Sequence, residues 1–184
     1  MRRLGAELGF EAMSLYKHVA NKEEILDGMV EHVIGEIEIP PEGAEWKEAM
    51  RRRAISARKV LSRHSWAIGL LEAGVSAGPT TLRYRDAIIG NLRSAGFAME
   101  NAAHAFSLLD SYVYGHVIQE VSLPFSSSEE MTDTAASTLD QTAMSEYPHL
   151  MAMYEHARTF SYSYDGEFTF GLDLILDGLE RHRT

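Results

Sequence analysis

Residues 2–26 read RRLGAELGFEAMSLYKHVANKEEIL, and this stretch decides the fold prediction. A short helix over Arg2–Leu8 is expected to close at Gly9, because glycine is the usual residue just past a helix end. A second short helix is expected at about residues 12–19. Asn21-Lys22-Glu23-Glu24 then places an N-cap residue three positions before a glutamate, which predicts the start of a third helix. Two short helices joined through a glycine turn fit the helix-turn-helix pattern.

Charge is unevenly distributed along the chain. Residues 1–22 carry four basic and two acidic residues, which gives a net charge of +2. Since the whole chain has a net charge of −10, the remaining residues carry −12. Contact with phosphate requires positive charge. A basic end on an acidic body therefore predicts a protein that touches DNA through that end only.

The same stretch carries a family resemblance. Residues 2–26 closely resemble the DNA-binding motif of the TetR (tetracycline-repressor) family, most specifically in Leu15-Tyr16-Lys17-His18-Val19. Residues 96–102 are similar to the segment before the family's long central helix, and residues 171–180 to its closing helix. The resemblance covers nearly the whole chain and is weakest at about 122–160. It implies double-stranded operator DNA and a small-molecule effector of unknown identity as partners.

The resemblance also implies roles at the DNA-reading end. Arg2 matches an arginine that reaches a guanine edge, where two parallel donors meet two acceptors. Ala12 and Met13 match base-facing positions of the recognition helix and offer apolar contact only. The positions that match phosphate contacts are Ser14, Tyr16, His18 and Lys22. Helical spacing alone also leaves Lys17 available to DNA. The alternative is that Tyr16 and His18 merely pack the small module.

Family members normally have a further helix before the position of Met1, and it packs beneath this pair. Two short helices alone bury too little surface to be well ordered. We therefore expect the sequence to belong to a longer protein rather than to a truncated one.

The rest of the chain shows helical spacing, so the predicted fold is all-α. We expect residues 1–38 to hold the DNA-binding region and a linker helix, and residues 39–184 to form a helical-bundle domain for ligand sensing and dimerisation. A polar loop is expected at 122–133. Helices are expected at about 22–37, 45–62, 64–72, 79–95, 99–120, 134–144, 148–160 and 166–182.

Composition narrows the class of protein. Hydrophobic residues make up 45% and charged residues 24%, the balance of an ordinary soluble protein. No run approaches the ~18 apolar residues that a membrane span needs, and no secretion leader is evident. The absence of cysteine excludes disulfides, thiol catalysis and thiolate metal sites. The prediction is a cytoplasmic protein with no membrane partner.

The family resemblance implies an effector pocket between the central helices of the larger domain. Ser111 matches the histidine through which the founding repressor holds a metal-bound drug, so neither a metal nor a cofactor is predicted. A mostly apolar lining with a few polar groups suits a small molecule. The candidate lining residues are Leu70, Phe97, Ser111, Tyr114 and His116. Plain core packing is the alternative for each.

Two glycines in the last helix suggest a subunit contact. Gly171 and Gly178 lie seven residues apart, and therefore on nearly the same face, beside Leu174 and Ile175. Small residues permit close approach of a partner helix, so a homodimer is predicted through helix 166–182 and a neighbouring helix. The alternative is that both glycines pack within their own subunit.

The linker helix must carry any signal from the body to the DNA-reading end. We expect it to run from about Lys22 to Ile37 and to stop before Pro40-Pro41. Its apolar face, Leu26, Met29 and Val33, is expected to pack on the body.

Two other functions stay open. Gly74–Gly78 spells G-x-S-x-G with Ser76 at its centre, the pattern of a hydrolase nucleophile elbow. That pattern requires a strand before the serine, whereas residues 66–73 predict a helix, so no catalytic residue and no enzyme is predicted. The second alternative is a dimeric ligand-binding protein that does not touch DNA, which the basic end and the motif disfavour.

Overall fold

A computed structural model of the chain describes residues 2–9, 11–74, 78–123, 146–159 and 163–183. All regular structure in these ranges is helical, which confirms the all-α prediction. The helices are α1 (Arg2–Leu8), α2 (Ala12–Leu15), α3 (Lys22–Gly35), α4 (Trp46–Arg63), α5 (Trp66–Glu72), α6 (Pro79–Ser94), α7 (Met99–Ser122), α10 (Pro148–Thr159) and α11 (Tyr164–Glu180). None of them combines the length and the apolar character that crossing a membrane requires.

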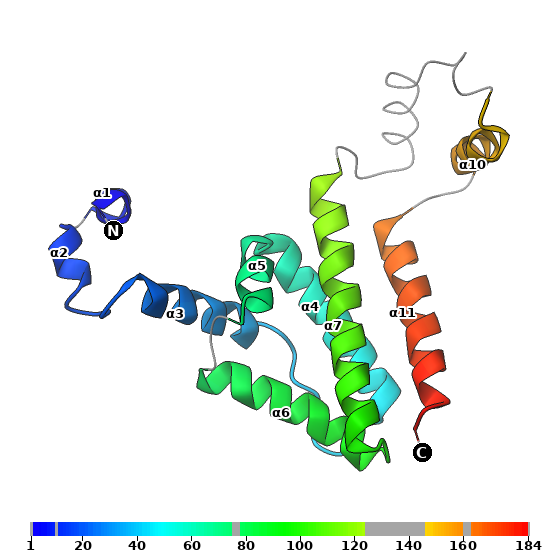
Figure 1. Cartoon of the computed structure of the whole chain (residues 1–184), viewed down its shortest axis with the longest axis horizontal. Helices are drawn as coiled ribbons and strands as arrows, with labels where there is room; N and C mark the ends of the chain where they lie inside the picture. The colour runs from blue at the N-terminus through cyan, green and yellow to red at the C-terminus, as the bar shows by residue number, and fades with distance from the viewer. Residues whose placement is uncertain (1, 10, 75–77, 124–145, 160–162, 184) are drawn as a thin grey trace.

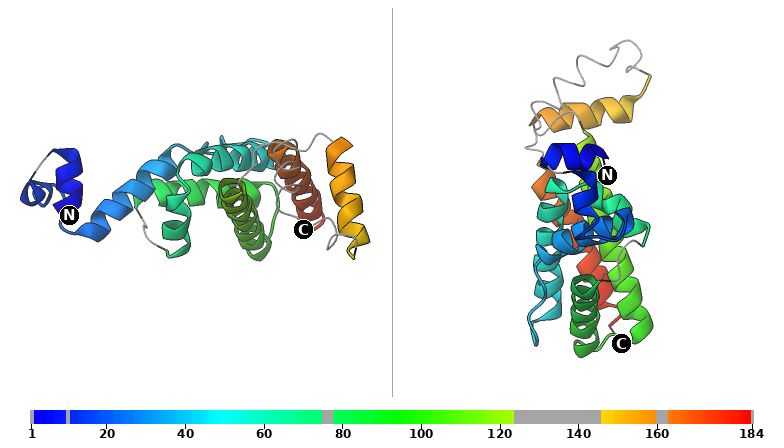
Figure 2. Two further views of the ribbon diagram at one scale, coloured as in Figure 1. Left: turned by 90° about the horizontal axis from the view of Figure 1, so that it is seen from above. Right: turned by 90° about the vertical axis from the view of Figure 1, so that its left-hand side faces the viewer.

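The molecule is elongated. Helices α1 and α2 lie at one end, and α3 connects them to a body formed by α4, α5, α6, α7 and α11 (Figure 1). Helix α10 lies beyond the body at the opposite end, as the view from above shows (Figure 2). The end predicted to read DNA is thus held away from the body by one helix.

Short-range signals set most helix ends where the sequence predicts them. Gly9 and Gly96 adopt the left-handed conformation, with φ of 71° and 99°, and end α1 and the α6 segment. The Asn21 side chain accepts a hydrogen bond of 2.8 Å from the Glu24 amide and starts α3. Pro79 occupies the first turn of α6. The second helix is shorter than predicted. It ends at Leu15, and residues 16–18 form turns.

The core of the body is assembled around α7. Its buried residues recur every three or four positions and are fully inaccessible: Ala102, Ala105, Leu109, Val113 and Val117. Helices α4, α6 and α11 supply the surrounding apolar side chains, among them Met50, Leu61, Ile88, Leu92, Leu172 and Leu176. The predicted helix 134–144 lies outside the described residues.

Helix α3 packs on the body through a different face from the predicted one. Val30, Val33 and Ile34 are buried, whereas Met29 is 40% exposed. The prediction was wrong at Met29. The side that contacts α5 and α6 carries residues 30, 33, 34 and 37, so the buried face is rotated by about one residue from the predicted one.

One acidic side chain joins α3 to the start of α6. The Glu31 carboxylate accepts hydrogen bonds from the amides of Thr80, at 2.7 Å, and Thr81, at 3.0 Å, and from the Thr81 hydroxyl. We call this arrangement the Glu31 clamp. Gly78 leaves room for the carboxylate, because a Cβ at that position would force the Glu31 side chain to shift. Negative charge at a helix N-terminus is also stabilised by the helix dipole.

Burial by itself raises the pKa of Glu31, but hydrogen bonds from Thr81 and Thr80 outweigh it and lower the pKa from 4.5 to about 2. A pKa lowered by folding contributes stability above the unfolded pKa, and this contribution is lost as the pH falls.

We predict that the free energy of unfolding decreases as the pH falls from 4.5 towards 2. In a Glu31→Gln variant, which has no carboxylate to protonate, this decrease should be smaller. Chemical denaturation at a series of pH values measures both. Parallel pH profiles for the two proteins would contradict the prediction.

Candidate functional site

The residues predicted to read DNA lie on the surface of α2 and the turn after it. Met13 is 73% exposed and Tyr16 45% exposed, and Lys17 and His18 are exposed beside them. Ser14 is half-buried, and its hydroxyl donates a 2.7 Å hydrogen bond to the Glu11 carbonyl. The small module therefore leaves these side chains at the far end of α3, where a large partner can approach.

The other predicted DNA contacts come from helix starts. Arg2 begins α1 and Ala12 begins α2, while Lys22 is exposed at the first position of α3. The first turn of α3 also holds two acidic residues, and the Asn21 side chain already caps it. The Lys22 ammonium, rather than the bare helix end, is thus the group suited to a phosphate.

The five residues predicted to line an effector pocket do not come together. Phe97 is fully buried and packs edge-on against Trp46, with ring centroids 4.9 Å apart. Leu70 is half-buried in α5 and Ser111 is exposed on α7. Tyr114 and His116 point to opposite sides of α7, since a helix turns about 100° per residue.

His116 faces α11. Its ring lies 4.9 Å from that of Phe168 and 6.2 Å from that of Tyr164. Burial, with a further contribution from the Arg58 charge, lowers the pKa of His116. A neutral imidazole is therefore the form favoured near neutral pH.

Tyr114 faces a different group of polar residues inside the body. Arg53 of α4 donates through Nε to the Tyr84 hydroxyl at 2.7 Å, and its Nη2 pairs with Asp110. The Tyr114 hydroxyl lies 3.5 Å from Asp110 Oδ2. We call these four residues the polar cluster. The Phe106 ring lies beside it, with its centroid 5.9 Å from the guanidinium carbon.

Arg53 is the unusual member because it is 1% exposed and still lacks a partner for Nη1 among the described residues. A buried donor without an acceptor costs about 1–3 kcal/mol. Burial by itself lowers the pKa of Arg53, but Tyr84 and Asp110 raise it, so the guanidinium stays charged. Burial and the Asp110 charge raise the pKa of Tyr114, which keeps its phenol protonated. The polar cluster therefore offers a fixed positive donor inside an apolar bundle.

Space adjoins this part of the body. A cavity of about 90 Å³ borders Arg53 and Ala49 below the Pro40-Pro41 segment. A wider groove of about 650 Å³ runs between residues 40–46 and the second half of α6. None of the five predicted pocket residues lines either space.

Sequence reasoning missed Arg53, Tyr84 and Asp110, although one signal was available. The buried stripe of α4 runs through Met50, Ala54 and Ala57, and Arg53 stands within it at helical spacing. A charged residue inside an apolar stripe marks a buried ion pair or a ligand contact. Tyr84 and Asp110 carry no comparable signal.

The four residues predicted at a dimer interface lie in two environments. Gly171 is packed inside its own chain, because a Cβ there would collide with the Tyr112 phenol, and Ile175 is half-buried against the core. Leu174 is 59% exposed, and a Cβ on Gly178 would meet open space. Phe170, 66% exposed, continues the exposed side. We call Phe170, Leu174 and Gly178 the outer face of α11.

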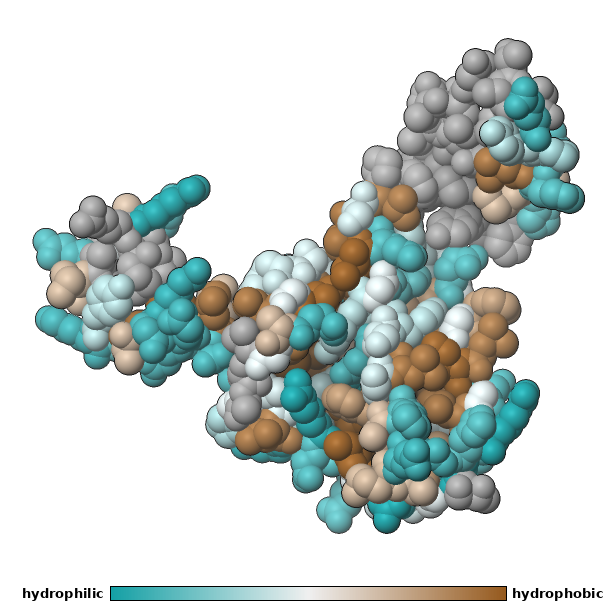
Figure 3. Space-filling model, viewed as in Figure 1, coloured by the Kyte–Doolittle hydropathy of each residue, from teal (hydrophilic) through white to brown (hydrophobic). Residues whose placement is uncertain are grey.

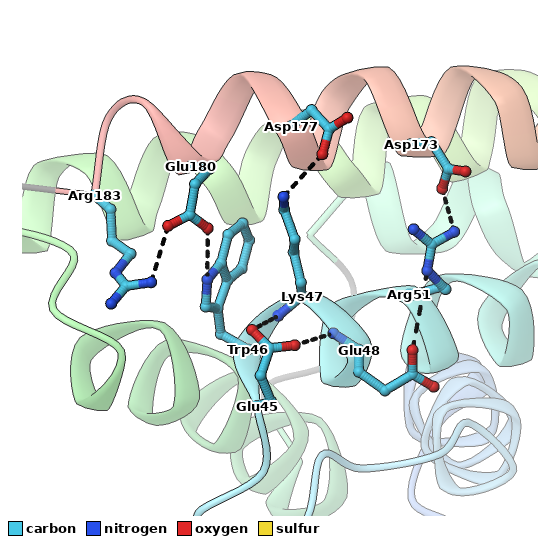
Figure 4. Close-up of polar contacts among 9 residues, drawn as sticks. All are labelled: Glu45, Trp46, Lys47, Glu48, Arg51, Asp173, Asp177, Glu180 and Arg183. Carbon is cyan, nitrogen blue, oxygen red and sulfur yellow. Dashed lines mark hydrogen bonds and ion pairs between the residues drawn. The ribbon is translucent and has the colours of Figure 1, made fainter.

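Polar contacts fix the orientation of α11 on α4 (Figure 4). Glu180 accepts a 3.1 Å hydrogen bond from the Trp46 indole, Asp177 pairs with Lys47 at 2.8 Å, and Asp173 pairs with Arg51. These contacts direct the outer face of α11 away from the subunit. Apolar side chains gather over α7 and α11 on the face seen in Figure 3. The exposed large apolar residues of α7 are Met99, Leu108, Ile118 and Val121.

Residues 39–183 match the family described as "Tetracyclin repressor-like, C-terminal domain". An HTH-type transcriptional regulator of Saccharopolyspora erythraea is 34% identical over 65% of the chain and 51% of its own length. The HTH-type transcriptional repressor DrrR1 of Streptomyces coeruleorubidus is 29% identical over 98% of the chain and 69% of its own length. The chain thus spans about half of the first relative and about two thirds of the second.

Solved structures give the same relationship. ActR of Streptomyces coelicolor, a TetR family protein, is 28% identical and superposes with a TM-score of 0.75, covering 100% of this chain and 87% of ActR. ActR has also been solved in complex with actinorhodin. Since the family match covers most of the chain, this protein belongs to the TetR family of transcriptional regulators.

Proposed function

We propose that this protein is a cytoplasmic transcriptional repressor that leaves its operator when a small molecule binds the body. The carrying observation is the exposed group Met13, Tyr16, Lys17 and His18, held beyond the body by α3. The net charge of +2 over residues 1–22 supports contact with phosphate there. Relatives named as repressors support the same function.

Binding of the full-length protein to duplex DNA at several salt concentrations tests this function against a ligand-binding protein without DNA contact. Ser76 of the hydrolase alternative lies outside the described residues. A chromogenic-ester assay with a Ser76→Ala control tests that alternative.

The proposed DNA contacts give a further prediction. Arg2→Ala should cost about 1–3 kcal/mol on the operator and relax preference at one base pair, as loss of a bidentate base contact does. Lys22→Ala should weaken operator and random DNA alike and reduce the salt slope by about one. Fluorescence anisotropy on both duplexes measures the difference. Equal losses on the two duplexes for Arg2→Ala would refute its base contact.

We further propose that the outer face of α11, with the exposed apolar residues of α7, forms a two-fold interface. A two-fold dimer requires one self-complementary surface on each subunit. Exposed apolar patches commonly mark such protein–protein interfaces. Gly178 permits a partner helix to approach closely, and among the described residues no neighbour within 4 Å of a Cβ there explains the glycine.

Gly178→Leu is therefore expected to leave the subunit folded and to weaken the dimer. Gly69→Leu is a matched control, because a Cβ on Gly69 also meets open space but lies on α5. Sedimentation velocity with circular dichroism distinguishes the two effects. A Gly178→Leu protein as dimeric as the Gly69→Leu protein would rule the interface out.

The polar cluster is the proposed anchor for the effector. A ligand that carries an acceptor oxygen, such as a phenolate, carboxylate or ring carbonyl, satisfies the unpartnered Nη1 of Arg53. The aromatic rings of Phe106, Tyr84 and Tyr114 suit a planar apolar body attached to that oxygen. The actinorhodin complex of ActR supports a small-molecule effector in this family.

Arg53→Met is expected to cost about 3–5 kcal/mol, because it leaves the Asp110 carboxylate without its cation in the interior. Arg53→Met combined with Asp110→Leu should recover most of that loss, since no buried charge then remains. Urea denaturation of the four proteins measures this cycle. Additive losses in the double variant would show that the ion pair is not the reason for either effect.

A further inference from the structure

The linker helix α3 is held to the body by two kinds of contact. Val30, Val33 and Ile34 supply apolar burial, which has little directionality. Polar contacts then fix its direction at two points. At its C-terminal end, Glu36 pairs with Arg63 of α4 at 2.8 Å. About one turn before that end, the Glu31 clamp binds the first turn of α6.

Because these two contacts attach α3 to two different helices, a relative movement of those helices changes the direction of α3. The Glu36 contact attaches it to α4, and the clamp attaches it to α6, while the DNA-reading end lies at the far end of the helix (Figure 1). A displacement of the α6 N-terminus relative to α4 therefore turns α3. The displacement is larger at residues 11–18 than at Glu31, because those residues lie farther from the attachment to α4.

The same end of α6 carries a member of the polar cluster. Tyr84 follows Thr81 by three residues, so both lie on one side of the helix, and both are buried at 4% and 1% exposure. The Tyr84 hydroxyl accepts a hydrogen bond from Arg53 of α4. The position of α6 relative to α4 is thus fixed by a polar bond one helical turn from the clamp.

We propose that Glu31 is a positioning residue that transmits the state of the polar cluster to the direction of α3. When the Arg53–Tyr84 bond is lost, the first turn of α6 shifts relative to α4, and the Glu31 carboxylate carries α3 with it. Two amide donors and one hydroxyl donor make this contact directional, which the apolar contacts of α3 are not. The inference rests on the proposed function, in which the cluster meets the effector and α3 carries the DNA-reading end.

The absence of cysteine in the chain permits a direct measurement. Lys17→Cys and Lys59→Cys place spin labels at exposed positions on the DNA-reading end and on α4. Double electron–electron resonance then gives the distance between them, with labelled chain diluted in unlabelled chain to suppress distances between subunits. Neither DNA nor effector is needed.

Four backgrounds form a cycle: the parent chain, Glu31→Gln, Tyr84→Phe and the double variant. Glu31→Gln keeps the shape of the side chain and removes its charge, and Tyr84→Phe keeps the ring and removes the hydroxyl. Glu38→Gln is the matched control, because the Glu38 carboxylate binds Arg52 of α4 instead of α6. Asp110→Asn perturbs the cluster from α7 and replaces Tyr84→Phe if circular dichroism shows that variant to be unfolded.

Each single variant is expected to shift or broaden the distance by at least about 1–2 Å, the scale of helix shifts in switching proteins. The double variant should match Glu31→Gln alone, because the cluster acts on α3 only through the clamp. Glu38→Gln should match the parent.

Three results would overturn the inference: no change in Glu31→Gln, additive shifts in the double variant, or an equal shift in Glu38→Gln. The proposed function has a separate test, because loss of DNA binding leaves these distances unaffected. A protein that binds its operator but shows additive shifts retains the proposed function and loses the transmission role of Glu31.

Discussion

Burial of one side of α7 is the constraint on which the rest of the body depends. Its five fully inaccessible residues begin with two alanines and continue with Leu109, Val113 and Val117. The two alanines leave room for neighbouring helices at the start of α7, and the three larger residues supply most of the apolar volume farther along it. Helices α4, α6 and α11 all take their positions from this stripe. Every functional feature of the body is consequently placed relative to α7.

The polar cluster sits at the edge of that stripe, and its chemistry follows from the position. The Asp110 side chain is only 14% exposed, so its carboxylate requires a cation nearby. Arg53 supplies that cation from α4 and pairs with Asp110 and Tyr84. A buried ion pair contributes little net stability compared with apolar packing. Unlike an apolar core, such a pair presents polar atoms that can exchange hydrogen bonds, which is the reason for proposing it as the effector anchor.

The two ends of the molecule have different requirements. The proposed DNA-reading end keeps Met13, Tyr16 and Lys17 exposed, and its net charge of +2 suits a polyanionic partner. The body is acidic, and its residues form contacts that hold helices in fixed positions, such as Asp173 and Asp177 of α11 against α4. Helix α3 belongs to both parts. Its first turn carries Lys22, and its C-terminal half carries the Glu31 clamp.

The sequence by itself determined the helical order of this protein and most of its helix ends. Gly9, Asn21, Pro79 and Gly96 act on backbone groups within about four residues, so their effect is readable without knowledge of the fold. The DNA-reading stretch was readable for the same reason, since its residues lie within one short segment. Exposure of Met13 and Tyr16 agrees with that prediction, although their contacts with DNA stay predictions.

Only the tertiary structure decided which side of each helix meets which neighbour. Glu31 and Thr80 are 49 residues apart, and Arg53 and Asp110 are 57 apart, so no periodic pattern connects them. Gly171 and Gly178 share a helix face in the sequence, yet Tyr112 approaches the first, and no residue in the described part of the chain approaches the second. Helical spacing gives the angle between residues on one helix. It leaves undetermined how far each neighbouring helix is rotated and shifted, because many side chains must pack together to fix those two quantities.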